Sequence, residues 1–297
     1  MRRASSVELM LLTVVVLWAL NITVTRYVLT HGFRPLAFST TRYGLAAVLF
    51  FLITLAVERS VRISRRDLPL VGGAALALFL NQVAFVYAVK TTTASAVALI
   101  LGATPIFAAL FGLAFRTETV SRRFWLGAAI SFGGVGLVAA GAGGRLSGHL
   151  GGVLLGVCTA ATWAAYSVAI TPLMRRYSPQ RISAIVLLLG WVGIALAGSH
   201  QARAQDYALG WRVWALFAFA TLGPLLLTNI LFFRALHRIG PARATLATNL
   251  QPFVAALVAL ILLSEQITAI QVAGGACIAA GIVVARRRSA VPVAPVD

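Results

Sequence analysis

Apolar segments of about 20 residues recur along the whole chain, separated by short groups of arginine, glycine and proline. A helix of about 20 mostly apolar residues is long enough to cross a bilayer, whose hydrocarbon core is about 30 Å thick. No segment between them has the length of a separate soluble domain. The pattern predicts an all-α membrane protein with ten transmembrane helices, at residues 7–29, 36–57, 68–89, 93–115, 123–141, 150–171, 182–199, 211–233, 241–263 and 267–285.

Composition points to the same class of protein. The chain is 60% hydrophobic and 11% charged, with a mean hydropathy of +0.92, whereas roughly a quarter of the residues in a soluble domain are charged. The net charge of +18 comes from short basic clusters between apolar segments rather than from one basic face. We therefore expect a lipid bilayer and a small-molecule substrate as partners, and no nucleic acid.

The basic residues also predict the orientation in the membrane. If the N-terminus is cytoplasmic, most of the 25 basic residues, Arg62 and Arg176 among them, fall in cytoplasmic segments. Ten spans return the chain to the same side, so both termini are predicted to be cytoplasmic in a multi-pass protein of the inner (plasma) membrane. The apolar stretch after Arg3 is longer than the core of a signal peptide, and we interpret it as a retained first span.

An internal repeat relates the two halves of the sequence. Proline, glutamate and glycine residues match in one register at a constant offset of 147 residues, and chance matches of these types are rarer in apolar sequence than matches of alanine or leucine. Because each half holds five spans, an odd number, the pattern predicts two inverted five-helix repeats. The matched pairs include Phe85 with Phe232, Pro105 with Pro252, Glu118 with Glu265, Gly127 with Gly274 and Gly134 with Gly281, while Trp18 meets Trp163 at an offset of 145. The predicted boundaries are 1–145 for the first repeat, 146–288 for the second and 289–297 for a cytoplasmic tail.

Several stretches together carry a family resemblance. They are Trp18 with Asn21, Arg42, the stretch from Pro105 to Glu118 with its echo from Pro252 to Glu265, and the run Trp163-Ala164-Ala165-Tyr166. In these residues the chain, over roughly residues 7–286, resembles the ten-helix EamA-type members of the drug/metabolite transporter superfamily, and the last run is similar to amino-acid exporters of that group. The resemblance implies export of a small metabolite, often an amino acid, from a bacterial cytoplasm through a central cavity lined by both halves. Some relatives carry a membrane-embedded glutamate for proton exchange, and that feature is missing here.

Polar amides near the centres of spans are candidates for substrate contact. A buried amide without a hydrogen bond is costly in hydrocarbon, so these side chains are expected to face the interior of the bundle. There they either bond neighbouring helices, which is worth about 0.6–2 kcal/mol each, or contact substrate. The candidates are Asn81 and Gln82 in the third span, Asn229 beside Thr228 in the eighth, and Asn249 and Gln251 in the ninth.

Three prolines are predicted to kink their helices: Pro105, Pro224 and Pro252. Proline lacks a backbone N–H, so it leaves the carbonyl four residues earlier without its helical partner. For Pro252 that carbonyl belongs to Thr248. A broken helix in the middle of the membrane is where many secondary transporters bind their ligands.

Two tryptophans lie near the centres of spans, away from the interfaces where membrane tryptophans collect. Helical spacing places Asn21 on the face of Trp18, and Tyr166 on the face of Trp163 together with Thr159 and Ser167. Each stripe is either an aromatic wall with hydrogen-bonding groups, suited to an amphiphilic substrate, or an aromatic packed between helices. The other tryptophans, Trp125, Trp191, Trp211 and Trp214, are predicted to be interfacial anchors.

Arg26 and Arg42 lie inside the outer halves of their spans. Either they extend to the membrane interface, or Arg42 attracts a substrate carboxylate or holds an outer gate. No acidic residue lies near the middle of a span, so a proton pathway through an intramembrane carboxylate is not predicted. Glu118 and Glu265 are expected to act at helix boundaries, and we expect no cofactor and no metal site.

The leading hypothesis is a secondary transporter that exports small metabolites, amino acids above all, by alternating access. The alternative is efflux of drugs or other hydrophobic compounds. A membrane enzyme is less favoured because no catalytic motif is present, and a channel because no filter motif or ring of charge is visible. Monomer and homodimer both stay open, since Gly127, Gly134 and Gly136 could pack within the bundle or between chains.

Overall fold

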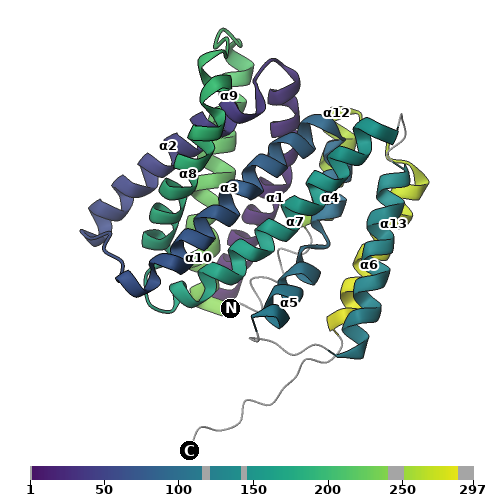
Figure 1. Cartoon of the computed structure of the whole chain (residues 1–297), viewed down its shortest axis with the longest axis horizontal. Coiled ribbons are helices and arrows are strands. Elements are labelled where there is room, and N and C mark those ends of the chain that lie inside the picture. Colours follow the sequence, from purple (N-terminus) through teal and green to yellow (C-terminus); the bar gives the residue numbers. More distant parts are fainter. Residues whose placement is uncertain (1, 116–120, 142–145, 240–250, 287–297) are drawn as a thin grey trace, which may run out of the picture.

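The computed structural model describes residues 2–115, 121–141, 146–239 and 251–286, and within these ranges the chain is helical with no strand (Figure 1). The helices of the first half are α1 (Arg2–Thr30), α2 (Pro35–Glu58), the short η1 (Arg65–Asp67), α3 (Leu68–Thr91), α4 (Ala94–Leu101), α5 (Thr104–Ala114) and α6 (Arg122–Gly141). Those of the second half are α7 (Leu146–Met174), α8 (Pro179–Arg203), α9 (Trp211–Thr221), the π-helix η2 (Leu222–Leu227), α10 (Thr228–Ile239), α12 (Gln251–Leu263) and α13 (Ala269–Arg286).

Ten spans account for these helices, as the sequence predicts. In the described residues, eight helical segments are long and apolar enough to cross a membrane, and two shorter apolar helices, Gln251–Leu263 and Ala269–Ala285, complete the set. Large apolar side chains cover the outside: Leu12 is 61% exposed and Leu196 is 73% exposed. Such a surface suits lipid rather than water. The predicted all-α membrane fold is confirmed, although residues 241–250 of the predicted ninth span lie outside the described residues.

The helices of the two halves pack in reciprocal pairs. α2 packs against α8, α4 against α12, and α6 against α13, so that equivalent spans meet. The remaining contacts come in mirrored sets: α3 with α7 is matched by α1 with α10, and α1 with α12 is matched by α7 with α4 and α5. This is the pairing that a two-fold relation between inverted repeats generates.

The last span of each half shows how closely two helices approach in this bundle. A Cβ added to Gly134 in α6 would lie 2.6 Å from the carbonyl oxygen of Gly274 in α13, and the reverse contact is equally short. Gly127 and Gly281 make a second contact of this kind. α6 and α13 therefore run side by side at one edge of the molecule (Figure 1), held by backbone contact that any side chain would prevent. Gly136, by contrast, faces open space.

The fourth span is broken into α4 and α5 at Gly102 and Ala103. Pro105 is the second residue of α5, and because proline has no N–H, the carbonyl of Leu101 has no helical donor. The hydroxyl of Thr104 donates to that carbonyl at 2.6 Å. The carbonyl that Pro105 leaves without a helical donor is thus bonded by a residue of the same span.

The α-helix of the eighth span is broken between α9 and α10 by the π-helix η2, which has Pro224 at its third residue. Here the carbonyl without a helical donor is that of Ala220, four residues before the proline. π-helical turns inside α-helices often occur at functional sites. The side chain that satisfies this carbonyl comes from the other repeat and is described with the site.

One end of the bundle is tied together by side chains that cap helix ends. Arg26 donates to the carbonyls of Val89 and Lys90 at 2.6 and 2.7 Å, and Lys90 donates to that of Leu29 at 2.7 Å. The carboxylate of Glu265 accepts the backbone N–H groups of Ala94 and Ser95 at 2.9 and 3.0 Å. Negative charge at the N-terminus of α4 and positive charge at the ends of α1 and α3 agree with the helix dipoles. We call this the capped end. It includes the predicted helix-boundary position of Glu265, whereas Glu118 lies outside the described residues.

Candidate functional site

A cavity of about 490 Å³ lies between the two repeats. Residues from α1, α2, α3, α4, α5, α7, α8, η2, α10, α12 and α13 line it, so both halves build its wall. The sequence-predicted site residues that it gathers are Trp18, Asn21, Arg42, Asn81, Gln82, Trp163, Tyr166, Asn229 and Gln251, together with Pro105, Pro224 and Pro252. Asn249 lies outside the described residues. Their contact with a substrate remains a prediction.

Arg42 is buried in the cavity wall and only 3% exposed, so it does not extend to the membrane interface. Its Nε and Nη2 donate to the carbonyl of Ala220 at 3.2 and 2.9 Å, which satisfies the acceptor that Pro224 leaves without a helical donor. Nη2 also donates to Oδ1 of Asn21 at 2.9 Å. Among the described residues no carboxylate contacts the guanidinium, and Nη1 has no hydrogen bond. The cavity therefore carries a fixed positive charge whose two Nη1 N–H groups have no partner among the described residues.

Trp18 is fixed to the broken helix of the second repeat. Its indole N–H donates to the hydroxyl of Thr228 at 2.8 Å and lies 3.2 Å from the carbonyl of Pro224. The ring also packs against Phe232 with centroids 5.6 Å apart. Trp18 therefore lines the cavity and also joins α1 to the eighth span by a hydrogen bond. It is packed between helices, and its contact with a substrate stays a prediction.

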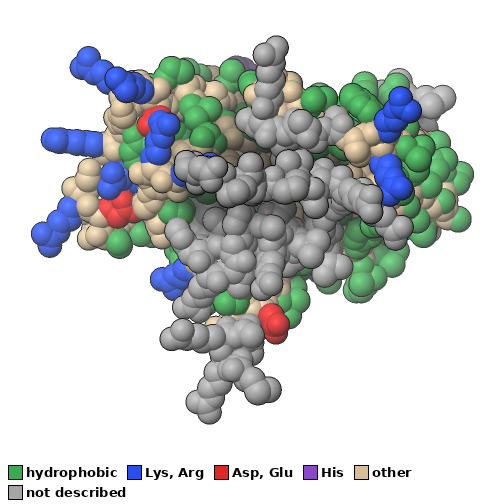
Figure 2. All heavy atoms as spheres, turned by 90° about the horizontal axis from the view of Figure 1, so that it is seen from below, with side chains coloured by type: hydrophobic (Ala, Val, Ile, Leu, Met, Phe, Trp, Pro, Cys, Tyr) green, Lys and Arg blue, Asp and Glu red, His purple; other side chains and the backbone are tan. Residues whose placement is uncertain are grey.

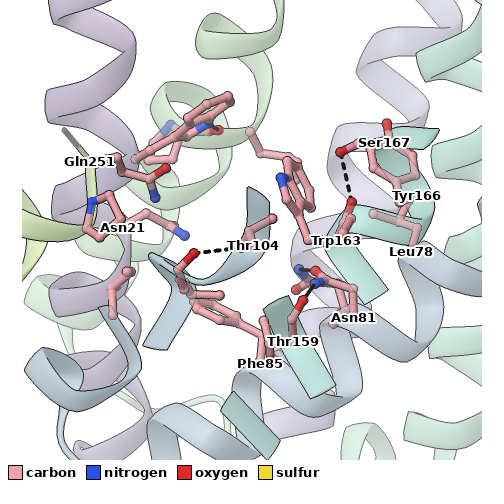
Figure 3. Close-up of a pocket in the computed structure, with 18 of the residues that line it drawn as sticks. Asn21, Leu78, Asn81, Phe85, Thr104, Thr159, Trp163, Tyr166, Ser167 and Gln251 are labelled. Carbon is pink, nitrogen blue, oxygen red and sulfur yellow. Dashed lines mark hydrogen bonds between the residues drawn. The ribbon is translucent and has the colours of Figure 1, made fainter. Parts of the chain in front are cut away.

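Trp163 is less constrained than Trp18. Its ring meets that of Trp18 edge-on at 6.4 Å and that of Tyr166 at 5.3 Å, yet its side chain is 37% exposed. Figure 3 shows the ring projecting among the labelled cavity residues, near Thr104. Three aromatic rings thus form one continuous apolar wall with an accessible face, which suits an apolar part of a ligand.

The amides of α3 form a chain of hydrogen bonds. Nδ2 of Asn81 donates to the backbone carbonyl of Thr159 on α7 at 2.9 Å and lies 3.4 Å from the hydroxyl of Thr162. Nε2 of Gln82 donates to Oδ1 of Asn81 at 3.4 Å. Asn81 thus joins two helices, as an interhelical hydrogen bond requires, and Gln82 continues the chain along the cavity wall.

The remaining predicted amides differ in how they are bound. Asn229 donates one of its two amide hydrogens to the carbonyl of Leu225 on its own helical segment and makes no other hydrogen bond among the described residues. Gln251 has no hydrogen bond among the described residues, and Figure 3 places it beside Asn21. Gln251 is thus free to bind a ligand, while Asn229 serves its own helix.

Sequence reasoning missed some polar residues of the cavity, among them Thr104 and Tyr43. Both had a signal in the sequence. Thr104 aligns with Gln251 at the repeat offset of 147 residues, and Tyr43 directly follows Arg42. Tyr43 holds its ring 5.9 Å from the guanidinium, within the range of a cation–π contact.

One predicted anchor is wrong. Trp191 does not lie at the membrane interface but packs over Gly44, where an added Cβ would come within 2.7 Å of the indole nitrogen. The indole donates to the carbonyl of Thr40 at 2.9 Å and so joins α8 to α2. The glycine makes room for the ring, and the carbonyl gives its N–H a partner, so burial costs little. The indole N–H of Trp214 instead donates to the backbone carbonyl of Tyr207, next to the capped end.

The described acidic residues lie away from the cavity. Asp67 pairs with Arg176 at 2.5 Å and accepts from Tyr177, while Glu58 pairs with Arg181 at 3.0 Å. In the described ranges no three histidine, cysteine, aspartate or glutamate side chains gather as metal ligands would. The cavity offers amides, hydroxyls, aromatic rings and one guanidinium, which are groups for binding rather than for covalent chemistry.

Comparisons with known proteins agree with this architecture. A crystal structure of another protein has a TM-score of 0.62 with this chain, covering 95% of this chain and 96% of its own, at 19% sequence identity. At that identity the likeness shows the fold alone. No protein with a curated description matches the chain. The profile of the EamA-like transporter family matches residues 5–140 and again residues 150–287. The chain therefore belongs to the EamA-like transporter family of the drug/metabolite transporter superfamily, and is a multi-pass membrane protein of the transporter class.

Proposed function

We propose that this transporter exports small metabolites that carry a carboxylate, amino acids foremost, across the cytoplasmic membrane by alternating access. The observation that carries the proposal is Arg42, a buried cation in the cavity wall with no acidic partner among the described residues. A buried charge is costly unless it is compensated. Carbonyl and amide oxygens compensate it in part, and a substrate carboxylate completes the compensation.

The same charge argues against cations as substrates. A lipophilic cation in this cavity meets a fixed positive charge and no described carboxylate, so its desolvation has no electrostatic compensation. The wall of Trp18, Trp163 and Tyr166 is equally suited to an apolar amino-acid side chain and to a hydrophobic drug. Efflux of neutral hydrophobic compounds is thus the second candidate.

The two ends of the bundle support a proposal for orientation and for the side from which substrate enters. The face that holds the N-terminus carries many arginine side chains around its rim (Figure 2), among them those between α2 and α3 and between α7 and α8. The positive-inside rule supports a cytoplasmic location for this face and an external location for the capped end. With the capped end tied, we expect the described conformation to receive substrate from the cytoplasmic side, with both termini on that side.

The test is efflux from proteoliposomes loaded with labelled compounds. We expect efflux of a few amino acids, no efflux of the corresponding amino-acid amides, which lack the carboxylate, and loss of efflux in Trp163→Ala. Equal efflux of acid and amide would remove the role of Arg42. Efflux of neutral lipophilic dyes without amino-acid flux would replace the proposal with the second candidate.

A further inference from the structure

Gln82 carries a buried hydrogen-bond acceptor that the fold leaves unused. The residue is 6% exposed and lines the cavity, and its Oε1 has no hydrogen-bond partner among the described residues. Leaving a buried acceptor unpaired is unfavourable, and each such atom in a native protein calls for an explanation.

The hydrogen-bond chain fixes which atom of Gln82 is unpaired. The backbone carbonyl of Thr159 can only accept, so the group of Asn81 that faces it must be Nδ2. Oδ1 of Asn81 then faces Gln82 and can only accept, which requires Nε2 of Gln82 on that side. Oε1 is therefore the free atom, and exchanging the two ends of the Gln82 amide would set two acceptors against each other.

The acceptor and the cation lie in different parts of the cavity. Arg42 is bonded to Asn21, and Gln82 is bonded to Asn81. Figure 3 shows Asn21 and Asn81 on opposite sides of the cavity, with Thr104 between them. One side thus holds a guanidinium donor and the other an unpaired amide oxygen, which is covered in the described conformation, so the cavity is electrostatically polar from one side to the other.

We propose that Gln82 is a specificity-determining residue whose Oε1 accepts a hydrogen bond from an N–H group of the substrate, so that the cavity selects carboxylates that also carry an amine. The proposal rests on the carboxylate function proposed above for Arg42. A site built to hydrogen-bond a donor rejects an analogue without it, because the acceptor is then left unpaired. Amine-free carboxylates are expected to bind more weakly than their amino counterparts.

The test compares pairs of molecules that differ only in the amine, measured as binding to the purified full chain. Suitable pairs are phenylalanine with 3-phenylpropanoate, alanine with propanoate, and 4-aminobutanoate with butanoate, which vary the position of the amine. For at least one pair the wild type is expected to prefer the amine-bearing member by about tenfold or more, the range of a hydrogen bond that involves a charged group. In Gln82→Met that preference is expected to fall to about twofold or less, with unchanged affinity for the amine-free member.

Two further variants separate specificity from folding. Gln82→Glu keeps an acceptor for the substrate but removes the donor that faces Oδ1 of Asn81, so this variant is expected to lose stability and to keep a preference for the amine. Ser131→Ala removes another buried hydroxyl without a described partner, but one at the packing of α6 against α13 and outside the cavity, and it is expected to change neither member of a pair.

The other possible outcomes of this binding test contradict either the role of Gln82 or the carboxylate function. Equal weakening of both members in Gln82→Met means that Gln82 only supports the structure, and an unchanged preference means that it does not contact the amine. Complete loss of the preference in a folded Gln82→Glu also contradicts the proposal. Wild-type binding of both members with equal affinity overturns the role of Gln82 alone, whereas binding of neither member in any pair removes the carboxylate function itself.

Discussion

The two broken spans beside the cavity solve one chemical problem in two ways. In each, a proline leaves a carbonyl without its helical donor. After α4 the carbonyl of Leu101 is satisfied by Thr104, three residues away. Before η2 the carbonyl of Ala220 is satisfied by Arg42, which belongs to the other repeat. The first break is thus complete within its own helix, while the second depends on the assembled bundle and ties the substrate cavity to it.

The largest effect is expected for Arg42→Met, because it removes the cross-repeat donor and the cavity charge together. The apparent affinity for a carboxylate substrate should fall by about tenfold or more, and the free energy of unfolding by about 1–3 kcal/mol. Efflux kinetics and unfolding in detergent measure the two effects. Arg26→Met is the matched control, since Arg26 also donates to backbone carbonyls but lies outside the cavity. It should lose stability and keep its affinity. An unchanged affinity in Arg42→Met would leave Arg42 a purely structural role.

A second prediction separates those two roles of Arg42. Pro224→Ala restores a backbone N–H that can reach the carbonyl of Ala220, so that carbonyl no longer depends on Arg42. In a double-mutant cycle, the loss of unfolding free energy caused by Arg42→Met should be smaller in the Pro224→Ala background by about 1 kcal/mol. Substrate affinity should not recover. Strictly additive stability effects would show that the proline does not create the need for Arg42.

Trp18→Phe should have a smaller effect. It keeps an aromatic ring in the wall but removes the N–H that joins α1 to Thr228 and Pro224, at an expected loss of about 0.5–1.5 kcal/mol in unfolding free energy. Trp214→Phe removes a similar bond, to Tyr207, away from the cavity. Only the Trp18 variant should change the rate of substrate efflux. Equal effects of the two variants on efflux would argue against a special role for the bond to the eighth span.

The smallest effect is expected at the locally satisfied break. Thr104→Val removes one neutral hydrogen bond to Leu101, worth about 1 kcal/mol or less in unfolding free energy. Thr171→Val is the control, because its hydroxyl also bonds a carbonyl of its own helix, at an exposed position on α7. A loss in Thr104→Val as large as that in Arg42→Met would cancel the distinction between the two breaks.

The sequence predicts candidate site residues well where a side chain lies at an energetically unfavourable position in the membrane. An amide such as Asn81 or a tryptophan such as Trp163 in the middle of an apolar span stands out, because hydrocarbon gives it no partner. The ten spans and the inverted repeat follow from hydropathy, from the odd number of spans in each half and from repeated proline and glycine.

What the sequence does not reveal is the partner of each residue. The acceptor for Arg42 is a backbone carbonyl 178 residues away that becomes available only because Pro224 is present. Trp191 appears interfacial until Gly44 is seen to make room for it. Such contacts depend on which faces meet, and residue types along the chain do not encode that directly.

The glycine contact between α6 and α13 has a consequence for biogenesis. Gly127 and Gly134 leave the ribosome with the first half of the chain, whereas Gly274 and Gly281 emerge after every other described span. Until then the nascent first half presents a bare backbone groove to lipid. The membrane insertion of α13 therefore sets the moment at which the first repeat acquires its final neighbour.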